Sequence, residues 1–328
     1  MEPNPCAFTR QAIRGRLSSC WFTCGRRRAI TPWCTSRPSW ASIPPSSRPP
    51  TPTPAPEPFG ILWLPDTQAL AYSHPEKLEA LGKEIVSRRE SENLIAVIHT
   101  GDIVDNGYKD AQWDNFDLCL NAFKDDLPFY PVAGNHDLGV KLLKYDAYLK
   151  RPFLSALPAE QTYGGGKMYY IRIERDGVEV LFLFVGWECG KTAEERAWLD
   201  GVFEQFPETP CILVTHAYLK DEGTLHSKGA HLEKYVVSAH PNVKLVLCGH
   251  RRDAVTTVFD YDDDDDGTND RAVPALMLNR QSGAYQYRVL RFDPLARTVE
   301  VRTFSLGKPE LIETDGKLAL SFTLTGIF

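Results

Sequence analysis

Residues 94–105 read Leu94-Ile95-Ala96-Val97-Ile98-His99-Thr100-Gly101-Asp102-Ile103-Val104-Asp105. The five apolar residues are typical of a buried strand, and the polar residues that follow mark its end. We therefore expect Asp102 in a loop at the carboxyl end of this strand, where open α/β sheets place their ligands. A carboxylate there is suited to hold a metal ion, and it can bridge two ions if a second one lies beside it.

Two further strand-helix units end in polar side chains. Residues 61–64 form an apolar run that leads into Asp66-Thr67-Gln68, and residues 128–133 lead into Gly134-Asn135-His136-Asp137. Apolar residues at helical spacing predict helices at 75–90 and 109–124. The carboxyl ends of parallel strands share one edge of a sheet, so these three tips are expected side by side.

The same pattern returns later in the chain. Apolar runs at 211–214 and 243–248 end at Thr215-His216 and Gly249-His250. A lone histidine is more often structural, but five metal-capable side chains at five strand ends favour a site. Further predictions are strands at 168–173 and 178–184, a helix at 193–206, and a flexible loop over the site at 163–167. C-terminal strands at 255–259, 273–278, 285–292, 298–304 and 318–324 are expected to form a second sheet that packs on the first.

Residues 1–58 differ from the rest in composition. They contain eight Arg, no Lys and two Glu, and their later part is rich in Pro, Ser and Thr. Repeated proline favours extended backbone, so we predict a disordered Arg/Pro-rich leader and linker at 1–58, and one catalytic domain at 59–328. The leader contains no apolar core of the ~7–15 residues that a secretory signal needs. The sequence therefore fits either a cytoplasmic or an exported protein.

Charge and cysteine content limit the functional classes. The net charge is -6, and because residues 1–58 contribute +6, the remainder carries -12. An acidic body argues against nucleic-acid binding, and no apolar run reaches the ~18 residues of a membrane span. The cysteines outside the leader lie far apart in apolar contexts and are predicted to be buried thiols: Cys119, Cys189, Cys211 and Cys248.

These strand-end motifs, taken in order, resemble the calcineurin-like metallophosphoesterase superfamily over residues 60–305. The resemblance is closer to a bacterial branch whose first motif reads Asp-Thr-Gln, as Asp66-Thr67-Gln68 does here. It implies a four-layer α/β/β/α sandwich of two mixed sheets flanked by helices. It also implies a metal-dependent phosphoric ester hydrolase, either a phosphodiesterase or a phosphomonoesterase.

The resemblance implies a dinuclear metal site. One ion would be held by Asp102, Asn135, His216 and His250, and the other by Asp66, Asp102 and Gln68. Gln68 stands where the superfamily usually has His, and Arg252 stands where it has the last His ligand. The first donor set suits Zn, Fe or Mn, whereas the all-oxygen second set favours Mn or Mg and binds more weakly.

The implied reaction is in-line attack at phosphorus by a metal-bound hydroxide. The resemblance gives His136 the protonation of the leaving alkoxide and gives Asp137 the orientation of His136. Arg252 cannot be a ligand because its guanidinium stays protonated. It would either neutralise charge on the phosphoryl oxygens or lie outside the site and pair with the acidic surface. Asp105 and His99 are expected to support the site from behind the ligands.

An acidic loop forms a second metal candidate. Asp262, Asp264, Asp266 and Asp270 match the first nine positions of a calcium loop, but Val273 replaces the bidentate Glu at position twelve. The alternative is a solvated acidic hairpin tip that keeps the edges of other sheets away.

The substrate is not readable from the sequence. Specificity would come from the loops at 138–167 and 217–232. Their histidines, His226 and His231, are expected to be exposed to solvent, and the alternative is contact with the substrate. The alternative to a hydrolase is a degenerate family member that binds a phosphorylated ligand without turnover. Gln68 and Arg252 favour that alternative, whereas the complete first metal site and His136 favour hydrolysis.

Overall fold

The computed structural model describes residues 55–139, 145–281 and 283–328. The predicted leader falls almost wholly on residues 1–54, which lie outside this part, so its disorder stays a prediction. From residue 55 onward the described chain forms one compact unit. Among the described residues, no helix is both long and apolar enough to cross a bilayer.

Six strands form the first sheet, in the order β15-β12-β11-β1-β2-β3. The strands β1, β2 and β3 run parallel, so their carboxyl ends lie at one edge, and β11 joins them antiparallel to β1. The bounds are β1 Phe59–Leu64, β2 Leu94–His99, β3 Phe129–Pro131, β11 Gln286–Asp293, β12 Thr298–Ser305 and β15 Phe322–Thr325.

Seven strands form the second sheet, in the order β4-β5-β6-β7-β8-β10-β9. Its central strands β6, β7, β8 and β10 are parallel, and β5 and β9 pair antiparallel at the two sides. The bounds are β4 Thr162–Tyr163, β5 Met168–Arg175, β6 Val178–Val185, β7 Cys211–Thr215, β8 Val243–Cys248, β9 Ala254–Tyr261 and β10 Arg271–Leu278. A small hairpin pairs β13 Thr314–Asp315 with β14 Leu318–Ala319.

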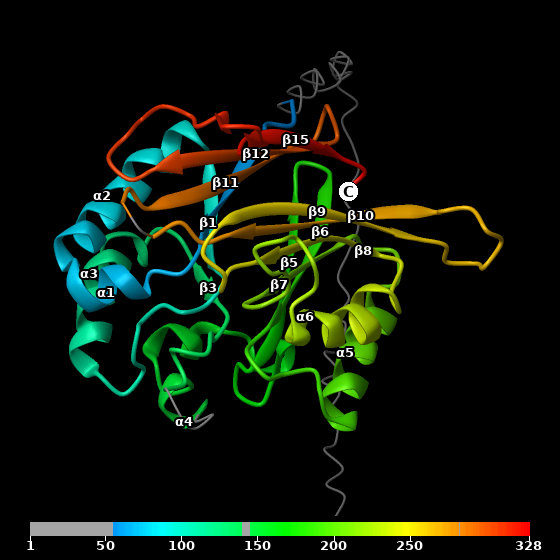
Figure 1. Cartoon of the computed structure of the whole chain (residues 1–328), viewed down its shortest axis with the longest axis horizontal. Helices are drawn as coiled ribbons and strands as arrows, with labels where there is room; N and C mark the ends of the chain where they lie inside the picture. The colour runs from blue at the N-terminus through cyan, green and yellow to red at the C-terminus, as the bar shows by residue number, and fades with distance from the viewer. Residues whose placement is uncertain (1–54, 140–144, 282) are drawn as a thin grey trace, which may run out of the picture. The chain divides into compact units, whose positions relative to one another are not determined.

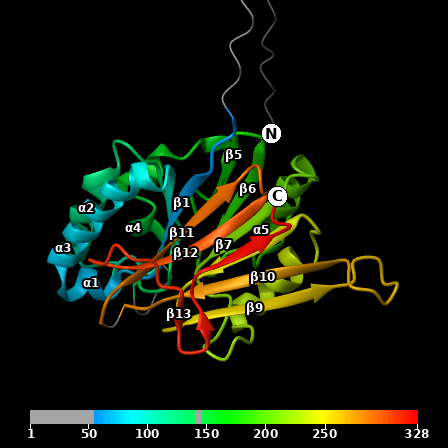
Figure 2. The same cartoon turned by 90° about the horizontal axis from the view of Figure 1, so that it is seen from above.

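Helices cover the outer face of each sheet (Figures 1 and 2). The first sheet is covered by α1 Gln68–Ser73, α2 Pro75–Ser91 and α3 Asp110–Phe123, and the second by α5 Ala193–Gln205 and α6 Ser227–Leu232. Short elements complete the chain: α4 Tyr145–Tyr148, the 3-10 turns Pro152–Ala156 and Ala159–Gln161, and a π-helical turn Glu233–Val237. The predicted α/β/β/α sandwich is confirmed.

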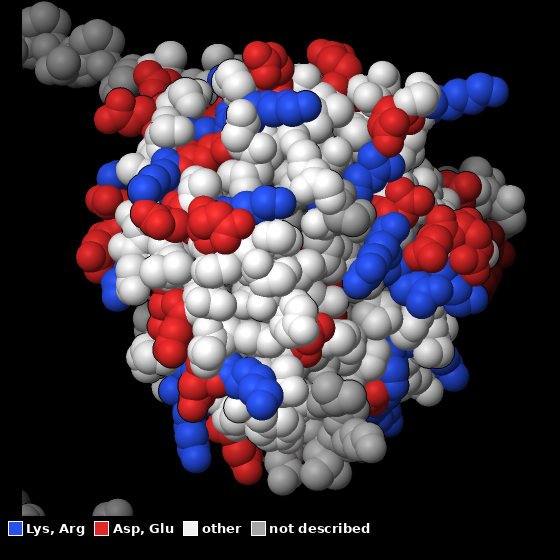
Figure 3. Space-filling view, turned by 60° about the vertical axis from the view of Figure 1, so that its left-hand side comes forward, with Lys and Arg blue, Asp and Glu red and all other residues white. Residues whose placement is uncertain are grey.

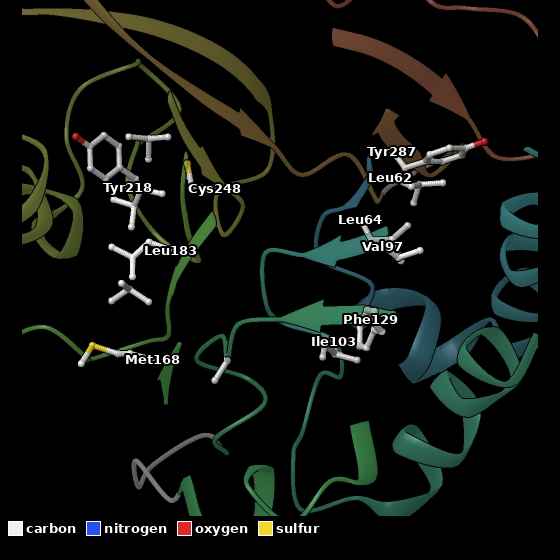
Figure 4. Packing of buried hydrophobic residues seen from close by; sticks show 14 of the residues in the cluster. Leu62, Leu64, Val97, Ile103, Phe129, Met168, Leu183, Tyr218, Cys248 and Tyr287 are labelled. Carbon is white, nitrogen blue, oxygen red and sulfur yellow. The ribbon is translucent and has the colours of Figure 1, made fainter. Parts of the chain in front are cut away.

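Successive residues of each inner strand are buried on opposite faces. In β1, Ile61 and Trp63 belong to the apolar layer between the sheets, whereas Leu62 and Leu64 belong to the layer beneath the helices. Figure 4 shows members of the helix-side layer on both sheets, such as Val97 on the first sheet. Because both faces are covered, the strands read as continuous apolar runs, as parallel sheets do.

The C-terminal strands do not form a sheet of their own, which corrects our prediction. The strands β9 and β10 extend the second sheet, while β11, β12 and β15 extend the first. The chain therefore crosses between the sheets after residue 278, beside the carboxyl ends of β1 and β8. The four predicted buried thiols are confirmed as free and buried: Cys119, Cys189, Cys211 and Cys248.

Two helical glycines differ in the space around them and give a matched test of packing. A Cβ added at Gly82 in α2 would lie 2.7 Å from the carbonyl oxygen of Cys119 in α3, whereas nothing lies within 4 Å of one at Gly201 in α5. Gly82→Ala should lower the free energy of unfolding by about 1–3 kcal/mol, because the helices must separate. Gly201→Ala should raise it by about 0.5–1 kcal/mol through helix propensity. Urea denaturation of both variants would measure the two changes, and equal signs would contradict the packing argument.

Candidate metal centre

Five strand ends from two sheets bring their polar side chains together. Asp66, Asp102 and Asn135 follow β1, β2 and β3 of the first sheet, and His216 and His250 follow β7 and β8 of the second. One ligand atom each from Asp102, His216 and His250 lie within 4.8 Å of one another. Residues separated by almost 150 positions in the sequence therefore meet in one cluster.

The ring of His216 lies at the centre of this cluster and is fully buried. Its Nδ1 lies 2.8 Å from the carbonyl oxygen of Thr100, so Nδ1 carries a proton. Its Nε2 is 3.2 Å from Asp102 Oδ2, 3.2 Å from Asn135 Oδ1 and 3.1 Å from His250 Nδ1. A neutral ring would direct the Nε2 lone pair at two oxygens and a nitrogen, so this arrangement needs a cation or a proton between the atoms. The donor set fits a divalent transition metal.

Electrostatics within the cluster follow from burial. Burial opposes the charge on His216, but the carboxylates of Asp102 and Asp66 outweigh it and raise its pKa to about 9. Burial alone would raise the pKa of Asp102, yet the nearby His216 brings it below its ordinary value. For Asp66 burial outweighs the nearby charge of His216, so its pKa lies well above the ordinary value. A cation would favour the ionised form of both carboxyl groups.

Asp102 is held by its backbone as well as its side chain. Its φ is +54°, in the left-handed region, and its carbonyl oxygen accepts hydrogen bonds from the amides of Thr67 and Gln68. Its Oδ1 accepts one from the amide of His136 at 2.8 Å. Asp102 thus links the ends of β1, β2 and β3.

His99 supports the Asp102 loop from below, as predicted. Its Nδ1 accepts a hydrogen bond from the amide of Gly101, so its Nε2 donates to the hydroxyl of Thr67, which in turn donates to the carbonyl oxygen of Ile103. Burial lowers the pKa of His99 to about 3, so the ring stays neutral in this chain of hydrogen bonds.

Two glycines of the motifs allow the strand ends to approach each other. A Cβ at Gly134 would lie 2.2 Å from Oδ1 of Asp102, and one at Gly249 would lie 2.2 Å from Oδ2 of Asp66. The amide of His250 donates to both carboxylate oxygens of Asp66, at 3.1 and 3.2 Å, and so joins the two sheets at the site.

Gln68 is the first residue of α1, a helix that the sequence analysis missed. Its side chain is 8% exposed, and its Oε1 has no hydrogen-bond partner among the described residues. An unpaired buried oxygen costs about 1–3 kcal/mol unless a ligand reaches it. The oxygen is consistent with the expected role of Gln68 as an oxygen donor to a cation.

The contacts of His136 differ from those we expected, which corrects the role of Asp137. We expected Asp137 to orient its ring, but the Asp137 carboxylate instead accepts hydrogen bonds from the amides of Gly134 and Val104, at 2.8 and 3.0 Å. The Nδ1 of His136 lies 2.7 Å from the carbonyl oxygen and 3.3 Å from the carboxylate of Asp105. Asp137 therefore ties two loops together, and burial raises its pKa to about 7.

No hydrogen bond or ion pair among the described residues joins Arg252 to the metal-ligand cluster. It is exposed, and it lines a cavity of about 340 Å³ with Asn279, Arg280, Ala284 and Gln286. The Nδ2 of Asn279 donates to the carbonyl oxygen of His250, so this cavity adjoins the cluster.

Two residues of the site's wall were not recognised from the sequence. The ring of Trp187 lies 5.7 Å from that of His216 and 5.4 Å from that of His250. The ring of His226, which we expected to be solvent-exposed, packs 5.0 Å from that of His250. Neither residue lies in a strand or helix, so periodicity gives no signal for its place in the site.

The acidic loop forms the tip of the β9–β10 hairpin, which projects from the body (Figures 1 and 2). One carboxylate oxygen each from Asp262, Asp264 and Asp270 lie within 4.8 Å of one another, whereas Asp266 uses an oxygen to accept from the amide of Thr268. Calcium binding by this loop stays a prediction. Elsewhere acidic and basic side chains are interspersed over the face in Figure 3.

Two known proteins are similar to this chain in sequence. An uncharacterized protein of Bacillus subtilis (strain 168), YvnB, is 33% identical over 261 residues, which cover 77% of this chain and 20% of that protein. A protein of Moraxella catarrhalis (strain BBH18), named a probable cyclic nucleotide phosphodiesterase, is 29% identical over 166 residues, 46% of this chain and 56% of that protein. The chain thus spans about a fifth and about half the length of these two relatives.

A solved structure shares the fold. The purple acid phosphatase PPD1 from yellow lupin (Lupinus luteus) seeds superposes with a TM-score of 0.52 at 14% identity, over 82% of this chain and 54% of that chain. The family model of the calcineurin-like phosphoesterases matches residues 59–251, more than half of the sequence, and the chain belongs to that family.

Proposed function

We propose that this protein hydrolyses phosphoric esters with two divalent cations at the Asp102–His216–His250 cluster. The observation that carries the proposal is the Nε2 of His216, which two oxygens and a nitrogen approach to within 3.2 Å. Membership of the calcineurin-like phosphoesterases supports the reaction type.

The donors divide into two sets of different chemistry. Asp102, Asn135, His216 and His250 offer imidazole and oxygen ligands suited to Zn, Fe or Mn. Asp66, Gln68 and the shared Asp102 offer oxygen alone, which suits Mn or Mg and gives the weaker site. When bound, such a pair of cations would polarise the phosphoryl group and lower the pKa of a water molecule.

His136 is the proton donor to the leaving oxygen in this proposal. Its backbone amide is fixed by Asp102, and its ring is held at Nδ1 by the backbone of Asp105, which directs Nε2 away from the protein contacts. The side chain of His136 is about one-third exposed, so a substrate can reach it. Arg252 acts on the substrate and not on a metal, because a guanidinium cannot coordinate a cation.

The proposed substrate is either a phosphodiester or a phosphomonoester. The relative from Moraxella catarrhalis, named a probable cyclic nucleotide phosphodiesterase, makes phosphodiesters the first substrates to test. The alternative is a protein that binds a phosphorylated ligand without turnover, and its motivation is the replacement of two expected histidine ligands by Gln68 and Arg252.

Asp102→Asn tests the metal centre. Asparagine tolerates the left-handed φ of this position, so the variant should fold, but it loses the charge shared by both donor sets. Metal content after purification should fall below one ion per chain, and hydrolysis of bis-p-nitrophenyl phosphate with added Mn should fall more than about 10³-fold.

The matched control is Asp114→Asn, which removes an exposed carboxylate from α3 and should leave both values unchanged. Full metal content in the Asp102→Asn variant would contradict the proposed role of Asp102 as the ligand shared by both cations. If wild-type protein retains metal but hydrolyses neither bis-p-nitrophenyl phosphate nor p-nitrophenyl phosphate, the result would favour the alternative, a protein that binds a phosphorylated ligand without turnover.

His136→Ala tests the proton donor. Metal content should be unchanged, and rates on esters with poor leaving groups should fall by about 10²–10⁴-fold, because those alkoxides need the proton most. Rates on p-nitrophenyl esters should fall much less. Asp105→Asn should shift the leaving-group dependence in the same direction to a smaller extent. A loss of equal size on every leaving group would exclude the proton-donor role.

A further inference from the structure

The cavity beside Arg252 has a wall of polar residues, among them Asn279 and Gln286. The Oδ1 of Asn279 and the Oε1 of Gln286 are buried and have no hydrogen-bond partner among the described residues. Asn279 itself is only 1% exposed. A buried polar atom without a partner is unfavourable, so the wall of this cavity is better suited to a polar occupant than to an apolar one.

The charges around the cavity are mainly positive. Arg252 makes no ion pair with any described residue, whereas Arg280 pairs with Asp253 and Asp315. A further guanidinium, Arg288, lies two residues after Gln286 on β11, so both side chains leave the same face of that strand.

Arg288 is 1% exposed and has no charged partner among the described residues. Its Nε donates to the hydroxyl of Thr303, and its Nη1 has no hydrogen-bond partner there. Burial and the nearby charge of Arg280 lower its pKa to about 9, so it stays mostly protonated near neutral pH. Two guanidinium groups, those of Arg252 and Arg280, line the cavity, and that of Arg288 is buried near Arg280. These three positive groups exceed the two carboxylates that pair with Arg280, and the excess positive charge favours an anion.

His250 separates this cavity from the metal centre. Its ring nitrogen Nδ1 faces His216, whereas its carbonyl oxygen accepts the hydrogen bond from Asn279 in the cavity wall. A substrate that spans His250 would place one group at the metal centre and another in the cavity.

We propose that the cavity lined by Arg252, Asn279 and Gln286, the Arg252 pocket, binds a second anionic group of the substrate. This inference rests on the proposed hydrolysis and narrows its substrate class to esters whose organic part bears a further phosphate or carboxylate. The guanidinium of Arg252 binds that group with paired hydrogen bonds. Asn279 and Gln286 complete the polar wall of the pocket.

Phosphate binding tests the pocket without any catalysis. Chelator-treated protein, which has lost its cations, is titrated with inorganic phosphate in a calorimeter. Wild type should bind phosphate, and Arg252→Gln should weaken the binding about tenfold or more. The control is Arg251→Gln, which removes the neighbouring exposed arginine that pairs with Asp221, and it should bind as wild type does. Equal binding by Arg252→Gln and wild type, or no binding by wild type, would overturn the proposal.

Turnover then tests whether the anion belongs to the substrate. Glycerol 2-phosphate and 2-phosphoglycerate differ at one carbon, where the first ester has a hydroxymethyl group and the second has a carboxylate. In the metal-loaded protein, Arg252→Gln should raise the ratio of KM for 2-phosphoglycerate to KM for glycerol 2-phosphate about tenfold. An equal loss on both esters would assign Arg252 to the reacting phosphoryl group and overturn the proposal. Absence of turnover on every ester would instead contradict the proposed function, and the phosphate titration would still decide whether the pocket binds anions.

Discussion

The buried carboxylate of Asp102 is the constraint on which the site depends. Asp102 has a left-handed φ, and its backbone carbonyl oxygen accepts hydrogen bonds from the amides at the start of α1. Its Oδ1 accepts a hydrogen bond from the loop that carries Asn135 and His136. A buried charge needs a compensating charge close by, and His216 lies 3.2 Å from it. The same carboxylate therefore organises three strand ends and draws positive charge to the point where they meet.

The two sheets hold the cluster together through a few cross-sheet contacts. The Nδ1–H of His216 on the second sheet donates to the carbonyl of Thr100 on the first, and the amide of His250 donates to Asp66. Each contact uses a backbone group, which the strands fix more firmly than a side chain could be fixed. Cations at this point would hold the sheets together further, so metal binding and stability are coupled here.

The sequence was sufficient for the inner strands, for the helices α2, α3 and α5, and for the cluster, because each has a local signal. Apolar runs that end in Gly-Asp or Gly-His identify strand exits, and the glycines are required where a Cβ would collide with Asp102 or Asp66. Sheet membership of the C-terminal strands has no such signal, because alternating apolar residues fit either sheet equally well. The partners of Asp105, Asp137 and His226 depend on how loops fold back, which involves contacts far apart in the sequence.

The departures from the family pattern fall on one side of the site. Gln68 and Arg252 replace two expected ligands of the same cation, and both replacements lie beside the segment that follows β10. In that segment Asn279 holds the carbonyl of His250, and Gln281 accepts a hydrogen bond from the amide of Ala69, next to Gln68. The crossing between the sheets therefore reaches both altered positions. A side chain released from metal binding at position 252 is free to face the cavity that this crossing forms. The residues proposed to hold the first cation are all present, so the proposed chemistry and the proposed recognition of the substrate would lie on opposite sides of His250.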